Sequence, residues 1–181
     1  MRRVSLFLGF LSLAGCLTLP PTASFNLPTN SLGMVEANAW LKRVEITDPA
    51  MTPLESRAQI ENALTNNLSR FLRDGKYFRK VELLPGIIQP QDLVLRFVFD
   101  RYRKERHWRV LANYDTSDLS ASLTLMRSDG TVVREARASV KEEHMVDSMS
   151  PEAALPSGMK ARTQLVEELL QKALLPQNSV P

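Results

Sequence analysis

The stretch LSASLTLMRSDGTVVREARASV, residues 119–140, decides the fold class of this chain. Between Leu119 and Leu125 apolar residues alternate with serine and threonine, which is typical of a strand with one face on a core and one face in water. The run Ser128-Asp129-Gly130 is a turn signal, and an alternating pattern returns from Thr131 to Val140. The stretch therefore predicts an antiparallel β-hairpin.

Strand patterns also precede the hairpin. The segment 93–99 alternates strictly, with leucine and phenylalanine on one face and Val94 and Val98 on the other, and it predicts the most buried strand. Residues 35–46 and 77–84 predict two more strands, and residues 108–114 are a candidate continuation of the sheet.

Two helices are expected. Thr52 as N-cap, Pro53 and Glu55 form a helix start, and Gly75 is expected to end this helix in a left-handed conformation. Its apolar residues recur at helical spacing: Ile60, Ala63, Leu64, Leu68, Phe71 and Leu72. A second helix is expected over residues 159–174, with inward-facing Ala161, Leu165, Leu169 and Ala173.

The order of these elements is strand, helix, several strands with a hairpin, and helix. A single layer of sheet covered by helices satisfies that order. The sequence therefore predicts an α+β fold, a single mostly antiparallel sheet of four to five strands with two helices packed on one face.

The N-terminus has the pattern of an export signal. Arg2 and Arg3 precede an apolar run from Val4 to Ala14, which is too short to span a membrane because a spanning helix needs about 20 apolar residues. The run ends in Leu13-Ala14-Gly15-Cys16, which resembles the lipobox of bacterial lipoproteins. A permanent membrane anchor and an ordinary secretory signal are the alternatives.

The lipobox resemblance implies a signal peptide over residues 1–15 and a covalent diacylglycerol and N-acyl lipid on Cys16, with no other cofactor. Residue 17 is Leu. In enteric bacteria an Asp at this place tends to retain lipoproteins in the inner membrane, so the resemblance implies the periplasmic face of the outer membrane, with the inner membrane as the alternative.

Composition bounds the rest of the chain. Without Arg2 and Arg3, 21 of the 23 basic residues stand against 20 acidic ones, so the exported protein is nearly neutral and nucleic acid is not an expected partner. The single cysteine excludes an internal disulfide. We expect a Pro-rich flexible tether over residues 16–33, one periplasmic domain over residues 34–175 and a loose tail over residues 176–181. In an alternative, Phe25 and Leu27 hold part of the tether against the domain.

A wider resemblance concerns the order of elements behind a lipobox. The run from Phe71 to Val81 (FLRDGKYFRKV) and the hairpin from Ala121 to Ala138 are similar to corresponding parts of small envelope lipoproteins. That group includes the lipopolysaccharide-assembly lipoprotein and the auxiliary lipoproteins of ABC-type lipid transport systems. The resemblance implies an accessory or assembly factor without chemistry of its own.

The sequence contains few of the motifs that are typical of an enzyme. The chain has no Gly-x-Ser-x-Gly motif, and its seven glycines lie too far apart to build a phosphate-binding loop. His144 and Asp147, with Glu142 and Glu143, form one candidate metal cluster, which we interpret as a solvated strand end. We therefore expect no catalytic residue, no metal and no enzyme activity.

The densest charged segment is RYRKERHWR, residues 101–109. Arginine forks suit phosphates and amphipathic aromatic rings suit interfaces, so one interpretation is a contact surface for anionic lipid headgroups or an acidic partner protein. Its candidate residues are Arg101, Arg103, Arg106, Trp108 and Arg109. The other interpretation is a solvated loop between strands, with Trp108 in the core.

Other large side chains also admit two interpretations. Trp40 and Phe71 are expected in the core in preference to a ligand contact. Met145, Met149 and Met159 surround the last loop, where they suit either a groove that adapts to lipid or ordinary gap filling.

The function expected from these observations is that of a membrane-anchored envelope lipoprotein. It would act as a non-enzymatic accessory, assembly or lipid-transport auxiliary factor by binding an envelope protein or a lipid. A carrier that encloses an acyl chain is one alternative, and an envelope enzyme is the second.

Overall fold

The computed structural model describes residue 27 and residues 34–51, 57–109, 112–146 and 157–174. Its elements in chain order are β1 (Val35–Leu41), β2 (Glu45–Ile46), α1 (Arg57–Asp74), β3 (Phe78–Leu83), β4 (Leu93–Arg109), β5 (Ala112–Arg127), β6 (Val132–Val146) and α2 (Ser157–Leu174). Cys16, the signal peptide, the start proposed for the first helix at Thr52 and the C-terminal tail all lie outside the described residues.

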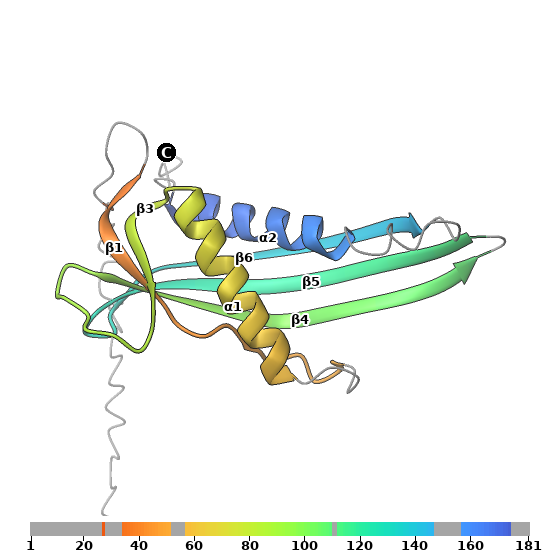
Figure 1. The fold of residues 1–181 in the computed structure, drawn as a ribbon, viewed down its shortest axis with the longest axis horizontal. Helices are drawn as coiled ribbons and strands as arrows, with labels where there is room; N and C mark the ends of the chain where they lie inside the picture. Colours follow the sequence, from red (N-terminus) through yellow and green to blue (C-terminus); the bar gives the residue numbers. More distant parts are fainter. Residues whose placement is uncertain (1–26, 28–33, 52–56, 110–111, 147–156, 175–181) are drawn as a thin grey trace, which may run out of the picture.

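The strands form one six-stranded sheet in the order β3-β1-β4-β5-β6, with β2 pairing β4 beyond the end of β1 (Figure 1). Pairings at the β3 side are parallel, β1 with β3 and both β1 and β2 with β4. The pairings of β4 with β5 and of β5 with β6 are antiparallel. The expectation of a single sheet is confirmed, whereas the count of four to five strands was too low and the sheet is mixed.

The parallel part follows from the position of α1. This helix connects β1 and β2 to β3, and a helical crossover brings the next strand back parallel to the first. The additional strand arises because the first predicted strand is interrupted. Val44 is fully buried at the interruption and its backbone N–H donates to Thr65 Oγ1 of α1 at 2.9 Å.

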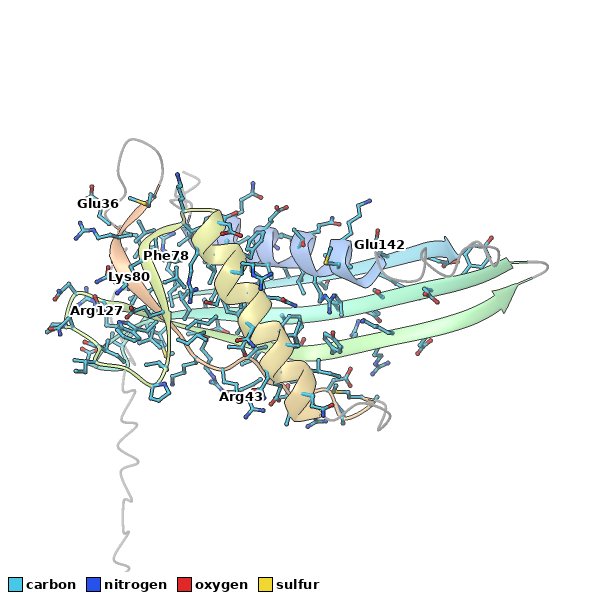
Figure 2. All side chains as sticks on the ribbon, viewed as in Figure 1. Glu36, Arg43, Phe78, Lys80, Arg127 and Glu142 are labelled. Carbon is cyan, nitrogen blue, oxygen red and sulfur yellow. The ribbon has the colours of Figure 1, made fainter. Side chains whose placement is uncertain are left out.

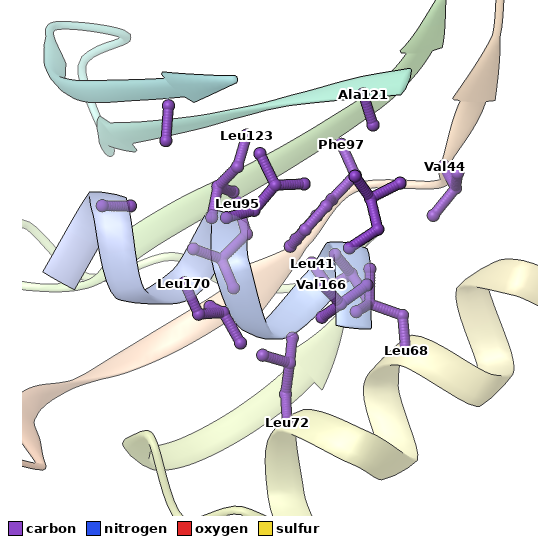
Figure 3. Close-up of a cluster of buried hydrophobic side chains, with 14 of the residues drawn as sticks. Leu41, Val44, Leu68, Leu72, Leu95, Phe97, Ala121, Leu123, Val166 and Leu170 are labelled. Atoms are coloured by element: carbon purple, nitrogen blue, oxygen red, sulfur yellow. The ribbon is translucent and has the colours of Figure 1, made fainter. Parts of the chain in front are cut away.

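Both helices lie in front of the sheet in Figure 1, and their apolar residues join those of the strands in one hydrophobic cluster (Figure 3). Leu95 and Phe97 are fully buried, and each is paired with a buried leucine of β5, Leu125 and Leu123. The strand predicted as the most buried is thus confirmed. The inward residues predicted for the second helix, Ala161, Leu165, Leu169 and Ala173, are all fully buried.

The end of α1 differs from the prediction. Lys76, and not Gly75, adopts the left-handed conformation, with φ of 52°. Gly75 still donates its N–H to the Phe71 carbonyl at 3.0 Å, as a helical residue does. It is needed for another reason, because a Cβ at this position would lie 2.3 Å from the ring of Tyr77.

The predicted hairpin turn is confirmed. Gly130 has φ of 87°, and Asp129 Oδ1 accepts a hydrogen bond from the Thr131 N–H at 2.8 Å. Only glycine adopts such a φ readily, which explains the Asp-Gly sequence at this turn.

β4 is longer than the sequence suggested, because it continues through residues 101–109. The interpretation of these residues as a loop between strands was therefore wrong. A β-bulge lies between Phe99 and Arg101, and it shifts the alternation so that Tyr102 is the next buried residue after Phe99. Beyond Tyr102, β4, β5 and β6 continue past the N-terminal end of α2 (Figure 1). We call this extension, residues 103–109, 112–118 and 141–146, the arm.

Leu27 is buried and belongs to the hydrophobic cluster, with 8% of its surface exposed. This agrees, for Leu27, with the alternative in which part of the tether is held against the domain.

Candidate functional site

An apolar groove lies between α1 and α2, next to the hydrophobic core. It encloses a volume of about 280 Å³. Its floor is formed by Val44 and Phe99 and its walls by residues of the two helices: Leu64, Leu68 and Phe71 from α1, and Met159 and Val166 from α2. Figure 3 shows three of these residues, Leu68 of α1, Val166 of α2 and Val44 before β2, within the buried hydrophobic cluster.

The residues that line the groove coincide only in part with those that face the core. On α1 the stripe that faces the core includes Leu64, Leu68 and Leu72 together with the buried Thr65 and Ser69. The neighbouring positions, such as Phe71, are only partly buried and line the groove.

The rim of the groove is polar and carries both charges. Asn67, Arg70 and Asp74 lie on α1, and Arg162 and Thr163 lie on α2. Arg162 Nη1 donates to the Tyr102 hydroxyl at 3.3 Å, which links this rim to the start of the arm. Such an arrangement suits a ligand that is apolar at its centre and polar at its edges.

Met159 stands at the lip of the groove with 62% of its surface exposed, so it does not fill a gap in the core. Phe71, expected in the core, is only partly buried: it packs against the hydrophobic cluster, and its ring stacks on that of Tyr77 with 5.9 Å between the ring centroids. Two large apolar side chains, Met159 and Phe71, therefore border the groove.

The basic residues singled out in the sequence all belong to β4. Arg101 Nη1 lies 3.3 Å from Asp118 Oδ1 of β5, and Arg103 Nε lies 3.4 Å from Asp48 Oδ2. In register Arg106 is opposite Asp115. The side chains of Arg106, Trp108 and Arg109 lie outside the described residues.

Asp48 is the residue that sequence analysis missed at the base of the arm. Its side chain is fully buried, and its carboxylate accepts hydrogen bonds from the N–H groups of Tyr102 and Ala50, each at 2.9 Å. Burial alone would raise the pKa of Asp48, but these hydrogen bonds and the charge of Arg103 outweigh it and hold the pKa below the ordinary value. The bulge at Asp100 leaves the Tyr102 N–H for this carboxylate, so Asp48 fixes the point at which the arm leaves the core.

A second buried carboxylate, that of Asp92, directly precedes β4 and lies beside β1. Asp92 accepts hydrogen bonds from Trp40 Nε1 at 2.8 Å, from Asn38 Nδ2 at 3.0 Å and from the Gln89 N–H at 2.9 Å. Burial raises the pKa of Asp92, and these three donors lower it further than burial raises it. Trp40 is half-buried and packs on Gly86, where a Cβ would lie 2.1 Å from the ring. Asp92 and Trp40 therefore hold a loop in place.

Other features of the described part of the chain bear on function. Within it, no group of three or more His, Cys, Asp or Glu residues is arranged to hold a metal ion. The side chain of His144, from the candidate metal cluster, and the whole of Asp147 lie outside it. Neither α1 nor α2 is apolar enough to cross a membrane.

Comparison with models of protein families found no match, and neither did comparison with curated proteins. Among solved structures, the chain is similar to protein XCC0632 from Xanthomonas campestris, assigned to the family DUF330. The TM-score is 0.53 at 16% sequence identity, over 80% of this chain and 88% of that one. At this identity the similarity establishes a shared fold and nothing further.

Two lipoproteins are also among the similar structures. A minor lipoprotein from Acinetobacter baumannii has a TM-score of 0.40 at 14% identity, over 76% of this chain and 87% of that one. Lipoprotein GNA1162 from Neisseria meningitidis has a TM-score of 0.37 at 16% identity, over 72% of this chain and 96% of that one. Both TM-scores are too low to support an inference about this chain.

Proposed function

We propose that this protein is a lipid-anchored envelope lipoprotein that performs no chemistry and acts by binding a partner protein. It would serve as an accessory or assembly factor, or as an auxiliary factor of lipid transport. The observation that carries the proposal is the groove between α1 and α2, which exposes Met159 and Phe71 beside a polar rim.

The size of the groove favours part of a protein over a whole lipid. Pockets that enclose a small ligand usually measure about 300–1,000 Å³, and this groove of about 280 Å³ lies just below that range. It suits a few apolar side chains from a partner helix, whose polar flanks would meet Arg70, Asp74 and Arg162. A carrier that encloses an acyl chain is the second candidate, and the apolar lining is the observation in its favour.

The arm, together with Arg101 just before it, supplies a second proposed contact. Arg101, Arg103, Arg106, Trp108 and Arg109 would meet an acidic partner surface or anionic headgroups. The internal ion pairs of Arg101 and Arg103 reduce the charge available there, so we assign this contact a smaller share of the binding. Changing Arg101, Arg103, Arg106 and Arg109 to Glu should weaken partner capture, and unchanged capture would contradict this contact.

The proposed location is the periplasmic face of the outer membrane. Cleavage before Cys16 and acylation of its thiol would attach the protein, and two or more acyl chains anchor stably where one does not. The inner membrane is the alternative location.

A photo-crosslinking amino acid placed in living cells tests the groove. At Met159 or Thr163, in the groove, it should yield one specific adduct with an envelope protein, identified by mass spectrometry. At Gln164 or Gln171, which are exposed on α2 but do not line the groove, it should yield none. Equal crosslinking from all four positions, or none from any, would contradict the proposed site.

A charged variant pair gives the matched control. Met159→Glu with Thr163→Glu adds two negative charges at the groove, and Gln164→Glu with Gln171→Glu adds the same charge elsewhere on α2. Only the first pair should abolish co-purification of the partner protein and raise envelope permeability. Native mass spectrometry of both variants distinguishes a lipid carrier from a partner-binding protein. In a carrier, an enclosed lipid would co-purify with the control variant and be lost from the groove variant.

A further inference from the structure

A basic surface lies at the end of the sheet where the N-terminal segment joins the domain. A hollow along β3 is lined by four exposed cations, Arg73, Lys76, Arg79 and Lys80, and by one carboxylate, Glu82. Lys80 forms an ion pair with Glu82, so the charges of the other three cations remain in excess along this hollow.

The chain enters the domain beside these cations. Met34 lines the same hollow, and the Val35 N–H donates to the Tyr77 carbonyl at 3.0 Å. Val35 is also paired in register with Phe78 at the start of β3. The start of β1 therefore lies at the basic edge of the sheet.

The length of chain between Cys16 and the domain limits how far the domain can lie from the membrane. Leu27 is held in the core, so only the chain from Cys16 to Leu27 separates the lipid from the domain, and fully extended it spans at most about 36–40 Å. The strand β4 alone is about 56 Å long. The connection is thus shorter than the sheet.

The arm lies at the other end of the molecule. Figure 2 shows Phe78 and Lys80 at the end formed by β1 and β3, whereas Glu142 lies near the start of the arm. If the basic edge faces the membrane, the arm points away from it.

We propose that Arg73, Lys76, Arg79 and Lys80 bind anionic lipid headgroups of the membrane that holds the anchor, and so direct the arm away from that membrane. The inference rests on the proposed anchoring through Cys16. It does not depend on what binds the groove. Each basic residue at an anionic surface should change the ratio of docked to undocked domain by about fivefold.

Lysine acetylation of the full lipidated protein in vesicles tests this contact. One vesicle preparation contains only zwitterionic phosphatidylcholine, and the other also contains anionic phosphatidylglycerol. Lys76 and Lys80 should react several-fold more slowly in the anionic vesicles, and high salt should remove the protection. Lys141 and Lys160, at the arm end, should react equally in both.

Two variants, each of which removes two positive charges, complete the experiment. Arg79→Gln with Lys80→Gln should lose most of the protection of Lys76, whereas Lys141→Gln with Lys160→Gln should keep it. Equal rates at Lys76 in both vesicles would overturn the contact while leaving the anchor intact. If the protein does not stay bound to zwitterionic vesicles, the proposed anchoring through Cys16 is wrong, and the proposed lipid contact, which rests on it, is wrong too.

Discussion

The strands β4, β5 and β6 run through both the helix-covered half of the sheet and the arm, but different interactions hold the two regions. In the first half β4 buries Leu95 and Phe97 against the two helices. In the arm, the face of β4 that carries Phe99 and Tyr102 continues with the exposed Lys104, so a charged side chain takes the place of those apolar residues. The buried carboxylate of Asp48 lies between the two halves and holds the Tyr102 N–H.

The difference assigns the stability of the fold to the covered half and leaves the arm for binding. Burial of apolar surface supplies most of the stability of a domain, whereas exposed ion pairs supply little. The covered half can therefore carry the fold, and the sequence of the arm can be adapted to a partner without unfolding the domain.

The largest effect is expected in the covered half. Phe97→Ala should lower the free energy of unfolding by about 3–5 kcal/mol, because it leaves a cavity in the centre of the core. Chemical denaturation measures the loss. Thr124→Ala, on the half-buried opposite face of β5, is the control and should change stability far less. Similar losses in both variants would mean that this half is not held by burial.

An intermediate effect is expected at the junction. Asp48→Asn should cost about 1–3 kcal/mol, because an amide nitrogen would face a backbone N–H that now has an acceptor. Hydrogen exchange should also increase at Tyr102 and in the arm. Asp118→Asn, which changes a carboxylate of the arm, should alter neither quantity appreciably, and a comparable effect there would remove the special role of Asp48.

The pH dependence of stability sharpens the role of the junction. The pKa values of Asp48 and Asp92 are lowered in the folded protein, so both groups stabilise it above the unfolded value of about 3.9. That stability should be lost as the pH falls from about 4 through the lower folded values. Denaturation midpoints measured across this range should fall less steeply in Asp48→Asn. Identical slopes in the two proteins would show that Asp48 does not contribute.

The smallest effect is expected where β4 enters the arm, at the ion pair between Arg101 and Asp118. Arg101→Ala breaks an ion pair with Asp118 that is half-exposed, and it should cost less than about 1 kcal/mol. A double-mutant cycle with Asp118→Ala measures the coupling between the two side chains. A coupling as large as the Asp48 effect would contradict the distinction between the two halves.

The elements that rest on local patterns were predictable. The alternation in residues 93–99 and 119–125, the Asp-Gly turn and the inward face of α2 each follow from neighbouring residues, and the structure confirms them. The length of β4 was missed because its pattern changes phase. Phe99 and Tyr102 are three residues apart, and this spacing is the signal of a bulge that the sequence contained.

The candidate site was harder to predict from the sequence, because its residues meet only in the folded chain. Asp48 and Tyr102 are far apart in sequence, as are Phe71 and Met159, and no periodicity relates them. The parallel pairing at β1 was missed for the same reason, since the direction of a crossover is set by packing and not by strand pattern. Gly75 was placed at the helix end correctly, but its role is to make room for Tyr77.

Acylation of Cys16 underlies the proposed location, the membrane contact of β3 and the direction of the arm. The most direct measurement is the mass of the intact protein and of its N-terminal peptide, purified from membranes. We predict a chain that begins at Cys16 and carries a diacylglycerol and an N-acyl group. A chain that begins at Met1, or that carries an unmodified thiol, would contradict the anchored arrangement.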